Sequence, residues 1–233
     1  MNALPRFIMF DLDGTLVDTA AEIAEAVNLT LREAGLSPIP ATQVRDWIGK
    51  GTAWLFGNAL ESATGDADIR NSARYTHLYP RFLQNYADLT GRMSTPYPGV
   101  KSALQGLHQS GCRLAVVTNK ERSLTLRLLD CHGLSDTFDV LVAGGDTPQG
   151  KPSPLPLQLA LQQAGVVAGD ALFVGDSSND VQASRNAGVS VWAFNHGYNH
   201  GESIASAGPD AVLDSFAELM TRLGVTPVQP ATH

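Results

Sequence analysis

The second half of the chain alternates short apolar runs with amphipathic stretches, and this alternation constrains the fold more than any other feature. The apolar runs resemble buried strands, and the amphipathic stretches end on or near a glycine, as helices often do. Strands that alternate with helices form parallel βαβ units. We therefore predict an α/β fold with a doubly wound, Rossmann-like parallel sheet. The predicted strands are 113–119, 138–145, 171–176, 189–195 and a weaker 210–214, and the predicted helices are 100–111, 122–134, 154–165, 179–188 and 215–224.

Residues 18–95 break this rhythm and read as helical throughout. Thr19 and Glu22 have the spacing of a capping box, and Ile23, Val27 and Leu31 then recur at helical spacing. No strand is expected in this segment. Further helices are expected around residues 43–49, 52–62 and 67–89, the last with a kink at Pro80.

The simplest organisation is an all-helical cap domain inserted into the α/β core. An apolar run at residues 7–10 supplies a first core strand, and a proline-rich stretch at 94–100 leads back to the core. We predict a core of residues 1–17 and 96–225, a cap of residues 18–95 and a tail of residues 226–233.

Composition narrows the class of partner. The 233 residues are 43% hydrophobic and 17% charged, with a formal net charge of −7. This balance argues against a surface for nucleic acid or an anionic membrane. Cys112 and Cys131 lack metal-site spacing, so we expect two free, buried thiols. Without a signal peptide or a long apolar stretch, a cytoplasmic location is expected; the oligomeric state is left open.

Polar residues follow several predicted strands where each strand ends. Asp11, Asp13 and Gly14 follow the first strand, and Thr118-Asn119 ends the next. Lys151 follows the third strand after a short loop, and Asp176 and Asp180 follow the fourth. Because ligands of doubly wound sheets bind at the carboxyl ends of the strands, we expect these side chains to share one site.

Their chemistry fits a phosphate site with a metal. Asp11 and Asp13 are two residues apart, so in extended chain their side chains point to the same side. Together with Asp176 they need a cation, and oxygen ligands favour Mg²⁺. The metal and Lys151 would attract a phosphate dianion, and Asp11 could attack phosphorus. Thr118, Asn119 and backbone N–H groups near Gly14 could hold the remaining phosphate oxygens.

The motifs Asp11-x-Asp13-Gly14-Thr15, Thr118-Asn119, Lys151-Pro152 and Gly175-Asp176-x-x-x-Asp180 resemble, in order, those of the haloacid dehalogenase superfamily. The resemblance implies Asp11 as nucleophile and Asp13 as general acid and then base. It implies Mg²⁺ bound by Asp11, the Asp13 main-chain carbonyl and Asp176, with Asp180 supporting the metal site or Lys151. Thr118 and Lys151 would bind the phosphoryl group.

Within the superfamily, Asp13 favours phosphoryl-oxygen chemistry, since dehalogenases and phosphonate hydrolases lack the second aspartate. The stretches 13–19, 47–51, 144–147 and 197–201 resemble the bacterial phosphoglycolate phosphatases. A small acidic phosphorylated metabolite, 2-phosphoglycolate above all, is the expected substrate. Lys50, on a cap loop between Gly49 and Gly51, would meet the substrate carboxylate.

Other interpretations stay open at this point. Asp11-x-Asp13-Gly14 alone could be a turn, and Lys50 could be a solvated turn lysine. Gly145 to Lys151 matches a nucleotide-binding G-x-x-x-x-G-K loop, but Pro152 replaces the required Ser or Thr. A different phosphatase, a sugar-phosphate phosphomutase or a non-catalytic protein on the same scaffold are the alternatives.

Overall fold

The computed structural model describes residues 4–226, which contain a six-stranded sheet in which every neighbouring pair of strands is parallel. The predicted tail of residues 226–233 lies outside the described residues except for its first residue. In spatial order the strands are β5 (Val140–Gly144), β4 (Arg113–Glu121), β1 (Phe7–Phe10), β6 (Ala171–Gly175), β7 (Ser190–Phe194) and β8 (Ala211–Leu213).

In this order β4 and β6 lie on either side of β1, and the position of the ligand site depends on these three strands. In the core the chain runs from β1 outward through β4 and β5, then returns to β6 on the other side of β1 and continues to β7 and β8. Doubly wound sheets bind ligands where the winding direction reverses, outside the carboxyl ends of the strands. Phe10, the last residue of β1, pairs with Val116 of β4 and Val174 of β6, so the residues that follow these three positions come out side by side.

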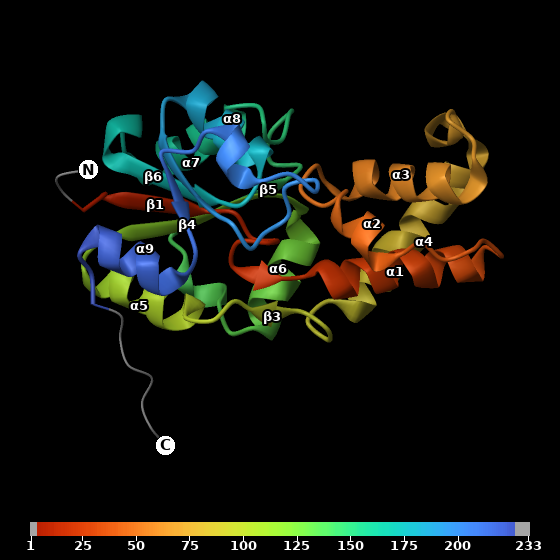
Figure 1. Cartoon of the computed structure of the whole chain (residues 1–233), viewed down its shortest axis with the longest axis horizontal. Coiled ribbons are helices and arrows are strands. Elements are labelled where there is room, and N and C mark those ends of the chain that lie inside the picture. The colour runs from red at the N-terminus through yellow and green to blue at the C-terminus, as the bar shows by residue number, and fades with distance from the viewer. Residues whose placement is uncertain (1–3, 227–233) are drawn as a thin grey trace, which may run out of the picture.

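Helices cover both faces of the sheet (Figure 1). Ile8 and Phe10 of β1 face a core built with the helices at residues 100–109, 122–131 and 216–223, and Phe7 and Met9 face a core built with the helices at residues 155–164 and 178–187. Because alternate residues of β1 enter the two cores on opposite faces of the sheet, β1 is apolar at every position. The helices are α5 (Val100–Gln109), α6 (Arg122–Cys131), α7 (Leu155–Ala164), α8 (Ser178–Ala187) and α9 (Phe216–Leu223).

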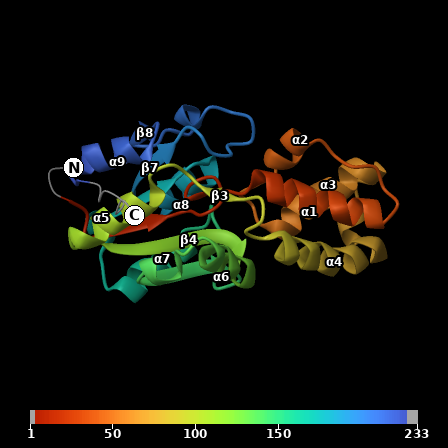
Figure 2. The same ribbon diagram turned by 90° about the horizontal axis from the view of Figure 1, so that it is seen from below.

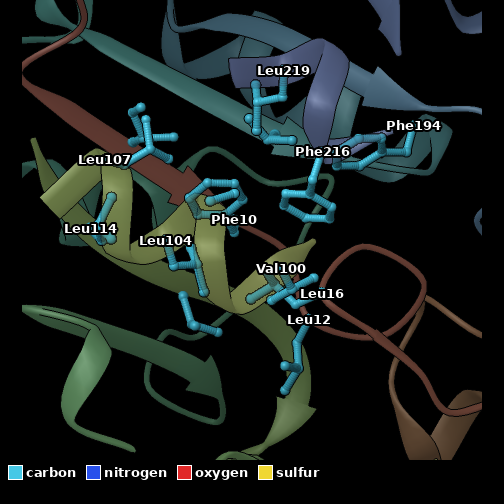
Figure 3. Close-up of a cluster of buried hydrophobic side chains, with 14 of the residues drawn as sticks. Phe10, Leu12, Leu16, Val100, Leu104, Leu107, Leu114, Phe194, Phe216 and Leu219 are labelled. Atoms are coloured by element: carbon cyan, nitrogen blue, oxygen red, sulfur yellow. The ribbon is translucent and has the colours of Figure 1, made fainter. Parts of the chain in front are cut away.

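Leu12 anchors the first strand end in one of these cores. Its side chain is fully buried in the same cluster as Phe10, Phe194 and Phe216 (Figure 3). Because side chains of extended chain alternate, burial of Leu12 turns its neighbours Asp11 and Asp13 to the other side. The apolar core therefore fixes the direction of both acids.

The segment between the first and second core strands forms a separate helical lobe at one end of the sheet (Figures 1 and 2). A two-stranded antiparallel ladder joins it to the core, with β2 (Val17–Asp18) on the way out and β3 (Thr95–Pro96) on the way back. The lobe has its own buried core, centred on Phe56, Phe82 and Tyr86. Its helices are α1 (Ala20–Glu33), α2 (Ala41–Arg45), α3 (Thr52–Thr64) and α4 (Ala73–Leu89).

The predicted fold class is confirmed, and several local predictions are wrong. Thr19 makes no capping hydrogen bond, because its hydroxyl donates to Asp13 instead, at 2.8 Å. Glu22 is fully buried and accepts from the backbone N–H of Gly91, at 2.9 Å. Tertiary partners thus replace the predicted capping box. Residues 18 and 95 lie in the short β2 and β3 strands, although no strand was expected there.

The two cysteines differ from the prediction in one respect. Both are free, but Cys112 is buried whereas Cys131 is exposed at the end of α6. In residues 4–226, no helix combines the length and hydropathy needed to cross a membrane.

Candidate active site

Asp11 and Asp13 lie beyond the buried part of β1, beside a cavity between the sheet and the helical lobe. Core residues Asp11, Asp13, Thr118, Asn119 and Lys120 form one side of the cavity. Its volume is about 30 Å³, so the lobe leaves little free space above the acids. The other wall comes from the lobe and is mostly apolar: Ile23, Ile48, Gly49, Gly51, Thr52, Leu55, Phe82 and Tyr86.

Three buried carboxylates gather at the switch point. Asp11, Asp176 and Asp180 each offer an oxygen within 4.8 Å of those of the other two. Their backbone positions follow from the sheet, since Asp11 directly follows β1 and Asp176 directly follows the neighbouring β6. Asp180 lies one turn into α8 and folds back to the start of the helix as part of a capping box with Ser177.

Lys151 lies among these acids. Its ammonium is 2.7 Å from Asp180 Oδ1 and 2.9 Å from Asp11 Oδ1, and it donates to the Val117 carbonyl at 2.9 Å. The other Asp180 oxygen accepts from the backbone N–H groups of Asp176 and Ser177. Asp180 is therefore fully used in holding Lys151 and the Asp176 loop, which favours the supporting role over direct metal binding.

The charges of this group shift its acid–base behaviour. Burial raises the pKa of Asp11 from 3.8 to about 6, although Lys151 acts in the opposite direction. Burial, followed by the charges of Asp180 and Asp11, raises the pKa of Asp176 well above its ordinary value. Burial lowers the pKa of Lys151, but Asp11 and Asp180 outweigh it and raise the pKa above the usual value. Three acids and one lysine leave this cluster short of positive charge.

The donor set fits a hard divalent cation. Asp11 Oδ1 is buried and lies 2.9 Å from the Lys151 ammonium, the one cation set among three buried carboxylates in this group. Clustered carboxylate oxygens with too little positive charge are suited to an ion such as Mg²⁺. Asp13 is not part of this group, so its predicted contribution through the main-chain carbonyl stays a prediction.

Asp176 is positioned by residues that the sequence interpretation assigned no role. The Thr15 hydroxyl donates to Asp176 Oδ1 at 2.5 Å, and the backbone N–H of Tyr198 donates to Oδ2 at 2.7 Å. A side chain at Gly197 would lie 2.2 Å from the same carboxylate. Thr15 and the 197–201 loop both lie in stretches that resemble the bacterial phosphoglycolate phosphatases. This resemblance was the available sequence signal that they belong to the site.

Of the other predicted phosphate ligands, Thr118 lies where a phosphate could contact it and the Gly14 N–H does not. Thr118 is buried beside the cavity, as expected for a phosphate contact. The Gly14 N–H donates to the Val17 carbonyl, which argues against its predicted use by phosphate. Gly14, at φ 86°, allows close approach to Asp176, because a Cβ there would lie 2.4 Å from Oδ2.

Asn119 joins three segments. Its Nδ2 donates to the carbonyls of Gly49 and Lys151, at 2.9 and 2.8 Å, and its Oδ1 accepts from the Lys151 N–H at 2.8 Å. With both amide hydrogens in use, the residue positions Lys151 and the loop of the lobe. Its predicted contact with substrate stays a prediction.

Lys50 does not line the cavity. Its side chain is exposed, and its ammonium lies 4.8 Å from the centre of the Trp54 ring. The loop itself lies where the prediction put it, because Gly49 and Gly51 both contribute to the cavity wall.

Lys120 is the functional candidate that the sequence interpretation missed. It directly follows Thr118-Asn119, one residue before the end of β4, and only 3% of it is exposed. Its ammonium is 3.0 and 3.3 Å from the two Asp13 oxygens, and it contacts the hydroxyl and the ring face of Tyr86 in α4. Its place next to a predicted motif at a strand end was the only signal in the sequence.

Comparison with known proteins identifies the family to which this cluster of acids and lysines belongs. The sequence model of the haloacid dehalogenase-like hydrolases matches residues 8–194, which span every acid and lysine described above. The chain belongs to this family.

Full-length relatives support the same conclusion. The chain is 39% identical over 225 residues to the phosphoglycolate phosphatase of Vibrio parahaemolyticus, covering 95% of this chain and 97% of that one. A crystal structure described as a predicted phosphoglycolate phosphatase from Haemophilus somnus superposes with a TM-score of 0.90 at 32% identity, covering 95% and 99% of the two chains. The CbbY protein of Rhodobacter sphaeroides, solved with phosphate, gives a TM-score of 0.80 at 26% identity, covering 93% and 96%.

These findings confirm the predicted family, the resemblance to phosphoglycolate phosphatases, and the enzyme class, a phosphoric monoester hydrolase.

Proposed function

We propose that this protein hydrolyses 2-phosphoglycolate to glycolate and phosphate, with Asp11 as nucleophile. The observation that carries the proposal is the pairing of Asp11 with Lys151, at 2.9 Å, at the switch point of the sheet. The chain's full-length relatives include phosphoglycolate phosphatases. A small phosphorylated metabolite is the partner this geometry suits.

Each side chain would have a distinct task. Asp11 faces the cavity and would attack phosphorus, forming an aspartyl-phosphate. Lys151 and Thr118 would hold phosphoryl oxygens, and Asp180 would keep Lys151 in place. Asp13, which lines the same side of the cavity as Asp11, would protonate the leaving oxygen and then deprotonate the hydrolytic water.

The proposed cofactor is Mg²⁺, bound by Asp11 and Asp176 with the Asp13 main-chain carbonyl. When bound, the ion would offset the negative charge of phosphate and carboxylates. The three clustered, buried acids, with Lys151 as their one cationic partner in the group, support this assignment.

We also propose that residues 18–95 act as the cap. The cavity of about 30 Å³ is too small for a phosphate ester, so the lobe must move to admit one and then close to exclude water. We propose a cytoplasmic location as well, which the two free cysteines favour.

The test is a phosphate-release assay over a panel of small phosphate esters, with and without Mg²⁺. The proposal requires Mg²⁺-dependent release that is fastest for 2-phosphoglycolate. A product that keeps its phosphate at a new position would identify a phosphomutase instead. No release from any ester would contradict an enzymatic role.

A further inference from the structure

Lys120 is a buried cation beside the proposed proton-transfer acid, and the proposed chemistry gives it no task. Within the described residues it is the one cationic side chain that lines the closed cavity. Its 3% exposure means that its charge is balanced locally rather than by solvent.

Lys120 lies where a ligand in the cavity can reach it. Its ammonium is 3.0 and 3.3 Å from the two Asp13 oxygens and contacts the Tyr86 hydroxyl, and all three residues line the cavity. A lysine ammonium is a compact point charge that attracts any anion nearby. An anionic group bound in the cavity can therefore approach Lys120 while Lys120 stays paired with Asp13.

The position of Lys120 matches one place on a substrate. Asp13, the proposed acid, must lie next to the oxygen that bridges phosphorus and carbon. In a 2-phospho-oxy acid, the carboxylate is attached to the carbon that carries this oxygen. A cation 3.0 Å from the Asp13 carboxylate is thus where such a carboxylate would lie.

Among residues 4–226, no other cationic side chain lines the cavity. The wall contributed by the lobe is largely apolar, and Lys50 is exposed beside Trp54. A carboxylate transferred into such a space without a partner is strongly disfavoured. We infer that Lys120, rather than Lys50, binds the substrate carboxylate and makes the site selective for phosphate esters of 2-hydroxy acids. This inference rests on the proposed function.

A matched substrate pair isolates this contact. Ethyl phosphate has the carbon skeleton of 2-phosphoglycolate but carries a methyl group in place of the carboxylate. The kcat/KM for each would be measured in wild type, Lys120→Met and Lys50→Met, with the exposed Lys101→Met on α5 as control. If Lys120→Met does not fold, Lys120→Gln removes the same charge while keeping a hydrogen-bond donor for Asp13.

The expected result is a preference for 2-phosphoglycolate in wild type that falls roughly 10- to 100-fold in the Lys120 variant, the range of a hydrogen bond to a charged group. Lys50→Met and Lys101→Met should keep the preference. Any loss common to both substrates would measure the effect of Lys120 on Asp13.

Two other outcomes would overturn the inference. If the Lys120 variant loses activity equally on both substrates, or if Lys50→Met removes the preference, the inference fails and the proposed function stands. If wild type itself shows no preference for 2-phosphoglycolate, the proposed function fails together with it.

Discussion

Asp11 combines two properties that conflict in the metal-free protein. It must be ionised to attack phosphorus, yet burial raises its pKa to about 6. Ionisation of Asp11 therefore costs more in the folded protein than in the unfolded chain, and added positive charge would reduce this cost. Perturbed pKa values of this kind are common among catalytic groups.

This conflict predicts a pH dependence of stability. A carboxyl group whose folded pKa is raised stabilises the fold at pH below its unfolded pKa, and this contribution is lost as pH rises through about 6. In EDTA, Asp11→Asn should therefore melt above wild type at pH 7.5, by roughly 3 to 6 °C, and by less at pH 4.5. Thermal denaturation of the two proteins across this range checks the prediction. Asp176 is present in both proteins, so its own titration does not distinguish them. A difference in melting temperature that stays constant with pH would contradict the prediction.

Asn119 connects elements that are far apart in the chain. It ties the end of β4 to the Lys151 loop and to the Gly49 loop between α2 and α3. The lobe and the core are joined elsewhere too, since Arg45 donates to the carbonyls of His196 and Gly197. The two contacts differ in that Asn119 also positions a residue of the site.

This difference predicts distinct effects of two substitutions. Asn119→Ala leaves the N–H of Lys151 without its acceptor and should lower kcat/KM about tenfold or more. Backbone hydrogen exchange should rise at both the Gly49 and Lys151 loops. Arg45→Ala should raise exchange around residues 45–51 alone. Equal exchange patterns in the two variants would show that Asn119 acts only on the lobe.

At the scale of the whole molecule, a bound ion should link the acid cluster to global stability. A ligand that binds only the folded state at 100 times its Kd adds about 2.7 kcal/mol, which corresponds to roughly 5 to 10 °C in Tm. We expect Mg²⁺ to raise the Tm of wild type at pH 7.5 on this scale.

Two variants make this prediction specific to the site. Asp176→Asn removes a proposed ligand, and Gly197→Ala displaces the same carboxylate, so both should lose most of the Mg²⁺ effect. A retained shift in both would place the ion elsewhere.

Local pattern was enough to predict most of the architecture. The apolar run at 171–176 became β6 at Ala171–Gly175, because strands buried on both faces are apolar at every position. The same argument brought Asp11 and Asp176 to one edge of the sheet, and these acids do meet there.

What local pattern could not supply were contacts between distant segments. Lys120 and Tyr86 are 34 positions apart and belong to the core and the lobe, and nothing local marks them as partners. Thr19 and Glu22 have capping spacing, but Asp13 and Gly91 compete successfully for their side chains. At Lys50 the loop was predicted correctly, and the side chain between its two cavity-lining glycines points outward.

The most direct test of the account is Mg²⁺-dependent phosphate release from 2-phosphoglycolate by wild type and Asp11→Asn, with circular dichroism to show that both are folded. The nucleophile assignment predicts release by wild type and a loss of at least about 1,000-fold in the variant, since its amide cannot attack phosphorus. A folded Asp11→Asn protein that retains more than about one hundredth of wild-type turnover would contradict it.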